Sequence, residues 1–229
     1  MRITVKIRRR VWLRFFIGLV TIATLIAVAT VYFGGRTNPA APNAVATPTS
    51  SPASEIPVAV DAAPTGCLGG PDRTAAMVLA AQQTAPHTTN GAIEVAAAYV
   101  RWLNQYPYPS TADADAVSLA GLAQGAPTKD IRGFFATNPN LSGGLVPDST
   151  SFYLSTVPGV WHLEKASEEE VVATIGAGLV IEGALSPTLK GSITVTLNWE
   201  DGQWKFDSSV GTRTTQDLYS IGTPFTGGC

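Results

Sequence analysis

Residues 192–206 read SITVTLNWEDGQWKF, and this stretch decides the fold class. Four apolar side chains alternate with polar ones along its first half: Ile193, Val195, Leu197 and Trp199. That period of two predicts a strand with one buried face and one solvated face. Asp201-Gly202 supplies residue types that accept the positive φ angles of a tight turn. Trp204 and Phe206 then share one face of a returning strand, so we predict an antiparallel hairpin.

The residues before this hairpin also favour strands. We expect short strands at residues 151–154 and 160–165. The segment 170–185 contains VVATIGAGLVIEGAL. Its β-branched content predicts one long strand, with kinks or bulges at the glycines.

The preceding hundred or so residues have helical patterns instead. Residues 73–83 are rich in Ala, which favours a helix. In residues 92–106 apolar side chains recur at spacings of three and four, as on one face of a helix. Shorter helices are expected at 112–122 and at 128–135, the latter capped by Thr128. Helices followed by antiparallel strands predict an α+β domain with helices packed on a bent sheet.

A long apolar run lies near the N-terminus. Residues 15–33 read FFIGLVTIATLIAVATVYF and contain no charged side chain. As a helix rising about 1.5 Å per residue, this run would extend about 29 Å, which matches the hydrocarbon core of a bilayer. We therefore predict a single transmembrane helix over 15–33, preceded by a basic cytoplasmic tail over 1–14. A cleaved signal peptide is the alternative, although its apolar region would be shorter.

Charge is divided unevenly along the 229 residues. Residues 1–36 contain seven basic residues and no acidic one, whereas the remainder contains eight basic and all 17 acidic residues. Because basic residues favour the cytoplasmic side, we predict a cell-membrane protein with a cytoplasmic N-terminus and an extracytoplasmic C-terminal domain. The acidic remainder would repel a phosphate backbone, so we expect no direct nucleic-acid binding by the outer domain.

The extracytoplasmic part divides into a linker and a domain. Residues 34–66 are rich in Pro, Ala, Ser and Thr and contain no aromatic residue. Such a composition predicts a disordered linker, because it cannot bury enough apolar area to offset the entropy of ordering. Residues 67–229 have an ordinary size for a single domain.

Cys67 and Cys229 begin and end this outer domain. Cysteines outside the cytoplasm are usually oxidised, so we predict a disulfide that closes the domain into one loop. Two free thiols, or a disulfide between two chains, are the alternatives that remain open.

A family resemblance rests on several of these segments. The aromatic-rich helix end YVRWLNQYPYP (residues 99–109) and the hairpin TVTLNWEDGQWKF (194–206) resemble the nuclear-transport-factor-like fold, a curved sheet wrapped around helices to form a cone. With one membrane span before it, the chain resembles the bitopic conjugation proteins of Gram-positive bacteria, the TcpC-like and VirB-type assembly subunits. CLGGPD (67–72) and HTTNGAIEVAAAYVRWLNQYPYPS (87–110) are similar to actinobacterial proteins carried on integrative conjugative elements.

The resemblance implies a non-catalytic, membrane-anchored scaffold or assembly subunit of a conjugative, type IV secretion-like DNA-transfer apparatus. Its partners would be membrane lipid around residues 15–33, other envelope or secretion-channel proteins, and further copies of itself. An accessory subunit of another envelope complex, such as a lipid-import system, is the alternative function. Trp102, Tyr106 and Tyr108 form a possible protein-binding patch, and core packing is the competing interpretation of these side chains.

A pocket-bearing extracytoplasmic enzyme is the third functional hypothesis. No Ser lies in a G-x-S-x-G motif, and His87 and His162 are the two candidate bases for a nucleophile. Pocket chemistry would instead need a buried carboxylate or His with a raised pKa. His162, Glu164 and Glu182 are the candidates for that group. We expect no catalytic residue, no metal site and no cofactor.

Overall fold

The computed structural model describes residues 61–210 and 213–229. The predicted tail 1–14, the predicted transmembrane helix 15–33 and most of the predicted linker 34–66 lie outside the described residues. Within the described ranges, no helix combines the length and the apolar character needed to cross a membrane.

Four helices lie in the first half of the described chain: α1 (Ala75–Thr84), α2 (Thr89–Leu103), α3 (Thr111–Ala120) and α4 (Ile131–Thr137). Each is preceded by a residue whose side chain accepts a hydrogen bond from a backbone N–H of the first turn, as expected at a helix start. The prediction that Thr128 caps the last of them is wrong. Asp130 is the cap, because its carboxylate accepts from the N–H of Gly133 at 2.9 Å.

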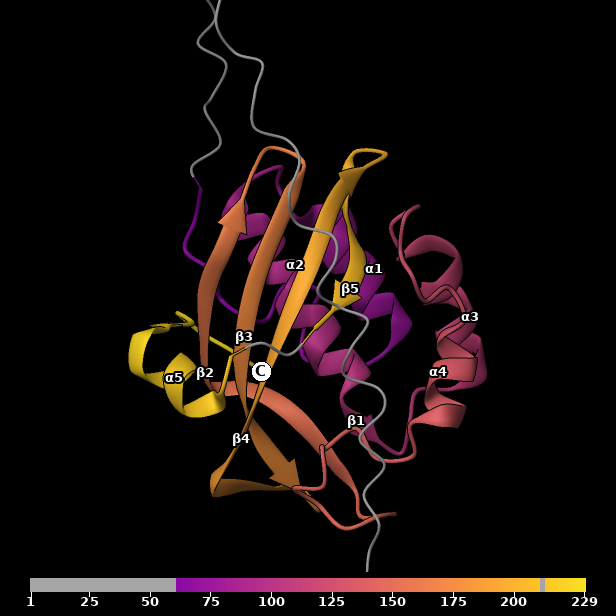
Figure 1. Ribbon diagram of the computed structural model, residues 1–229, viewed down its shortest axis with the longest axis vertical. Coiled ribbons are helices and arrows are strands. Elements are labelled where there is room, and N and C mark those ends of the chain that lie inside the picture. Colours follow the sequence, from indigo (N-terminus) through magenta and orange to yellow (C-terminus); the bar gives the residue numbers. More distant parts are fainter. Residues whose placement is uncertain (1–60, 211–212) are drawn as a thin grey trace, which may run out of the picture. The chain divides into compact units, whose positions relative to one another are not determined.

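The second half forms an antiparallel sheet of β1 (Gln105–Tyr106), β2 (Phe152–Ala166), β3 (Glu170–Ile181), β4 (Ala184–Glu200), β5 (Gln203–Ser209) and β6 (Thr223–Pro224). The described strands follow the order β1-β2-β3-β4-β5, and β6 pairs with β2. The sheet is curled and packed with helices, with α2 lying along it (Figure 1). The predicted α+β class is therefore confirmed, and the curled sheet is compatible with a cone-like fold.

The long strand predicted over 170–185 is present as β3 from Glu170, but it ends at Ile181 and not at residue 185. The chain turns at Glu182-Gly183, which have φ angles of 50° and 82°, and it returns as β4. A two-residue turn with both φ angles positive matches the right-handed twist of the strands on either side. The glycine irregularity predicted within this segment is present, because the β3–β4 register shifts between Gly178 and Val180.

The two short strands predicted at 151–154 and 160–165 are parts of one strand, β2. Their separation in the sequence corresponds to a shift of the β2–β3 register between Ser155 and Gly159. The interruption is therefore a local irregularity within a continuous strand.

The hairpin over 192–206 is confirmed, with φ angles of 53° at Asp201 and 76° at Gly202. Val195, Leu197 and Trp204 are buried as predicted. The opposite face is less exposed than expected, because Thr194 is also buried. The C-terminal segment lies against this face: Ser192 Oγ donates to the carbonyl of Arg213 at 3.0 Å.

The main core lies between α2 and the sheet. Every residue of α2 from Gly91 to Trp102 is buried, and α2 packs against β2, β3, β4 and β5. Trp102 and Trp204 are the largest fully buried side chains. A core of this kind, filled by aromatic and aliphatic side chains, dominates the stability of a domain.

A fifth helix, α5 (Thr215–Ile221), packs against β2, β3 and β4. It lies over Gly176, whose neighbours Ile175 and Ala177 point into the main core, so α5 covers the opposite face of the sheet. A Cβ atom at position 176 would lie 2.8 Å from Leu218 Cδ2, so the close approach of α5 requires glycine here.

Candidate functional site

The three residues of the predicted aromatic patch occupy different environments. Trp102 has no exposed surface, and its ring lies edge-on to those of Tyr99 and Phe135, with centroids 6.3 and 6.2 Å away. Tyr106 lies on β1 and Tyr108 follows it, both half-buried. Their rings are edge-on to each other at 5.7 Å. Trp102 thus contributes to core packing, and the two tyrosines retain surface that a partner can contact.

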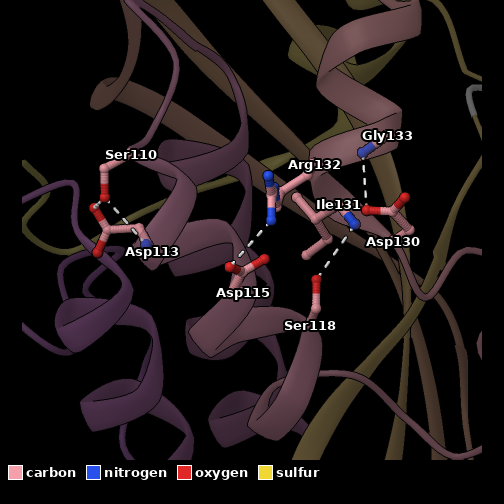
Figure 2. Close-up of polar contacts among 8 residues, drawn as sticks. All are labelled: Ser110, Asp113, Asp115, Ser118, Asp130, Ile131, Arg132 and Gly133. Atoms are coloured by element: carbon pink, nitrogen blue, oxygen red, sulfur yellow. Dashed lines mark hydrogen bonds and ion pairs between the residues drawn. The ribbon is translucent and has the colours of Figure 1, made fainter.

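Tyr108 also lines a groove of about 630 Å³ between α3 and α4. Figure 2 shows the polar contacts that join these helices: the Asp115 carboxylate lies 3.5 Å from Arg132, and the Ile131 N–H donates to Ser118 Oγ at 3.3 Å. Both side chains of the Asp115–Arg132 pair are more than half exposed. The pair is therefore worth little in stability. It gives the groove charges of both signs.

A second groove, of about 920 Å³, lies between the helices and the β4–β5 turn. We call it the leucine groove, because Leu79 of α1, Leu119 of α3 and Leu122 line one side of it. Glu200 and Asp201 lie on the other side. Leu119 is 90% exposed, the highest value among the exposed large hydrophobic side chains of the described residues.

The segment before α1 is held against α2 by a buried carboxylate. We call residues 64–73 the strap. Both Glu94 oxygens accept hydrogen bonds from it: Oε1 from the N–H and hydroxyl of Thr65, and Oε2 from the N–H of Gly66 at 3.0 Å and of Leu68 at 3.4 Å. Glu94 is 8% exposed. These bonds begin N-terminal to residue 67, where the predicted outer domain starts.

Arg101 near the end of α2 and Gln105 of β1 bind the strap carbonyls. Arg101, which is fully buried, donates from Nη2 to the carbonyls of Gly70 at 2.7 Å and Asp72 at 3.1 Å. Gln105 donates to the carbonyl of Arg73 at 3.1 Å. Burial lowers the pKa of Arg101 to about 10, and the positive charge of Arg73 acts in the same direction. The strap backbone is therefore bound by the carboxylate of Glu94 at its N–H groups, and by the guanidinium of Arg101 and the amide of Gln105 at its carbonyls.

The C-terminus is fixed to the strap by the predicted disulfide. Cys67 and Cys229 are bonded, with their Cα atoms 5.4 Å apart. The backbone of Cys229 also pairs with Thr156 of β2: the Thr156 N–H donates to the Cys229 carbonyl at 3.0 Å, and the Cys229 N–H donates to Thr156 Oγ1 at 2.9 Å. The Thr156 hydroxyl lies 2.9 Å from the Gly66 carbonyl as well. A disulfide of this kind fits an extracytoplasmic domain.

Of the residues considered for pocket chemistry, His162 and Glu164 share one face of β2, whereas Glu182 lies in the β3–β4 turn. Glu164 forms two hydrogen bonds with Arg213, at 2.7 and 2.6 Å, and accepts a third from Thr174. These contacts, with Arg213 as the largest cause, lower the pKa of Glu164 to about 2. Pocket chemistry would need a raised pKa. Glu182 is exposed in the β3–β4 turn, and His162 lies half-buried on β2.

His87 has a packing role. Its ring stacks on Trp199 with centroids 3.9 Å apart, and its Nε2 lies 2.6 Å from the carbonyl of Glu168. Across residues 61–210 and 213–229, no cluster of three or more His, Cys, Asp or Glu side chains is arranged to hold a metal ion.

Comparisons with protein-family models, with curated proteins and with solved structures found no match to this chain. The fold class therefore rests on the structure itself, and the resemblance given above remains a hypothesis.

Sequence reasoning missed Glu94, Arg101 and Leu119. Glu94 and Arg101 are seven residues apart on a helix whose other side chains are largely apolar, so they share one face. That spacing was a usable signal for a buried polar stripe. Leu119 carried no signal, because α3 also contains Val117 and an apolar residue in such a helix is ordinarily interpreted as core.

Proposed function

We propose that this protein is a non-catalytic, membrane-anchored scaffold subunit of a conjugative, type IV secretion-like DNA-transfer apparatus, with a nuclear-transport-factor-like outer domain. The observation that carries this proposal is the filled interior of the curled sheet. The buried residues of α2 pack against β2, β3, β4 and β5, which fills the space between helix and sheet where a cone-shaped enzyme would hold its substrate. The two grooves described above lie instead at the surface, where partner proteins bind.

The membrane attachment is supported by the sequence and by the chemistry of the disulfide. The apolar run 15–33 follows a basic tail, and the Cys67–Cys229 bond suits an oxidising compartment. The protein would then present the outer domain on the extracytoplasmic side of the cell membrane, connected to its span by the Pro-rich linker.

Genetic deletion tests the function. In the strain that carries the gene, removing it should abolish transfer of its conjugative element and leave growth unchanged. The full chain should restore transfer. A matched version, with residues 1–33 replaced by a cleavable signal peptide, should not, because the freed domain is no longer anchored. Normal transfer in the deletion strain would refute the proposal, and a defect in lipid uptake would favour the lipid-import alternative.

Anchoring itself is tested by fractionation. The full chain should remain with the membrane after washing in high salt and alkali, and its outer domain should be digested by protease added to intact spheroplasts. Recovery of the mature chain from the culture medium would show that the apolar run is cleaved.

A further inference from the structure

The leucine groove has an apolar side that no described residue covers. Leu79 and Leu122 are half-buried and Leu119 is almost fully exposed, although Leu is a residue whose burial is strongly favoured. The three side chains come from two helices and the segment that follows α3. An apolar surface of this kind beside a groove is typical of a protein-binding site.

The charges at this groove are predominantly acidic. Glu200 and Asp201 lie at the β4–β5 turn, and one Glu200 oxygen accepts from the Gln124 N–H at 2.6 Å. Lys205 is the basic residue of the groove lining. Its ammonium group already donates to the Ala120 carbonyl at 2.5 Å and to Gln203 at 3.2 Å. With two carboxylates and one ammonium group, the lining of the groove carries a net charge of −1.

The net charge of the domain also favours a cationic ligand. Residues 61–229 contain eight basic and 16 acidic residues, a net charge of −8. A second copy of this domain, or an anionic lipid surface, would be repelled over long range, whereas a cationic partner would be attracted.

We propose that the leucine groove binds a cationic amphipathic helix of a partner protein. Such a helix would place its apolar face on Leu79, Leu119 and Leu122 and direct Lys or Arg side chains towards Glu200 and Asp201. The proposal rests on the scaffold function, since it assigns a contact surface for that function.

The experiment uses the full chain in non-ionic detergent and a fluorescent helical model peptide. The peptide carries Leu at i, i+3, i+4 and i+7 and Lys at its other positions, and the signal from detergent alone is subtracted. A matched peptide has Glu in place of every Lys. We expect the cationic peptide to bind at least about tenfold more tightly than the acidic one.

Variants locate the binding. Leu119→Glu should weaken binding of the cationic peptide by about tenfold or more, because it puts a charge on the apolar side of the groove. Asp201→Lys should weaken it by about threefold at low salt and less at high salt. Leu145→Glu is the matched control, because Leu145 is 43% exposed and lies outside the groove lining. It should leave binding unchanged.

Equal binding of the two peptides, or equal losses from Leu119→Glu and Leu145→Glu, would overturn the proposal. A dimer that Leu119→Glu dissociates in the absence of peptide would do so as well, because a second copy would then occupy the groove. The peptide experiment and the deletion experiment can fail separately. If the deletion strain transfers its element normally while the purified protein binds the cationic peptide, the scaffold function is refuted and the groove assignment stands.

Discussion

The strap and α5 lie on different parts of the domain and are held by different chemistry. The strap is bound through its backbone, by Glu94 and Arg101 of α2, and is linked covalently to the C-terminus. α5 is held through side chains: Leu218 packs over Gly176, and Arg213 just before the helix pairs with Glu164. Backbone binding fixes the path of the strap, in which Gly66 and Gly69 have positive φ angles of 78° and 83°, whereas side-chain binding requires matched residues on both partners.

The largest expected effect concerns the covalent link. Replacing both cysteines, Cys67→Ser with Cys229→Ser, should lower the free energy of unfolding by about 2–5 kcal/mol, since the disulfide closes a long loop. Urea denaturation of the purified protein measures this. Hydrogen exchange should show residual protection of the strap, because Glu94 and Arg101 still bind it. A strap that exchanges freely in this variant would show that the disulfide alone holds it.

Glu94→Gln tests the backbone contacts separately. The variant replaces one acceptor oxygen by an NH₂ group facing N–H donors of the strap, so buried donors lose their acceptor. We expect a loss of about 2–3 kcal/mol in the free energy of unfolding. Glu168→Gln, at an exposed position in the β2–β3 turn, is the control and should change stability little. Equal stability of the two variants would show that the Glu94 carboxylate does not hold the strap.

Gly176→Ala tests the contact between α5 and the sheet. The added Cβ would approach Leu218 and Tyr219 to within 2.9 Å, so α5 must shift. The expected loss is about 1–3 kcal/mol, measured by urea denaturation. At Gly191 an added Cβ meets its nearest neighbour at 3.6 Å, an ordinary contact. Gly191→Ala should therefore be tolerated, and similar losses at both positions would point to backbone conformation as the cause.

Glu164→Gln should have the smallest effect, on the order of 1 kcal/mol at pH 7, because the ion pair with Arg213 is partly exposed. The pKa of Glu164 is about 2 in the folded protein against an ordinary 4.5, so folding favours the charged form. Its contribution is complete above pH 4.5 and is lost as the pH falls towards 2.

Urea midpoints between pH 7 and pH 2.5 measure this effect. The difference between wild type and Glu164→Gln should shrink across the acid range. Glu170→Gln provides the comparison, since the Lys165–Glu170 pair is more exposed, with 65% and 38% of the two side chains accessible. A difference for Glu164→Gln that does not change with pH would show that the carboxylate charge is not its cause.

The sequence predicted those parts of the fold that depend on local patterns. The hairpin over 192–206 has both alternation and an Asp-Gly turn, and its prediction was correct. The turn at Glu182-Gly183 was missed because Glu is an uncommon residue at a positive φ angle. The two halves of β2 were separated because an irregularity around Pro158 interrupts the pattern, although pairing with β3 resumes beyond it.

The candidate site was harder to predict, because its contacts join distant segments. Glu94 and Arg101 bind backbone groups of the strap, and backbone groups leave no trace in the side-chain sequence. The exposure of Leu119 depends on how α1, α3 and the β4–β5 turn are arranged. The disulfide was accessible to sequence reasoning, since the chain contains two cysteines and they flank the domain.

The link between Cys67 and Cys229 also determines how the domain responds to mechanical force. A pull on the chain before Cys67 passes through the disulfide to the last residue, whose carbonyl is hydrogen-bonded to Ser155 and Thr156 of β2. Residues 68–228 lie within a closed covalent ring, so tension from the N-terminal side cannot unravel them one after another. The domain would therefore withstand stretching as a single unit.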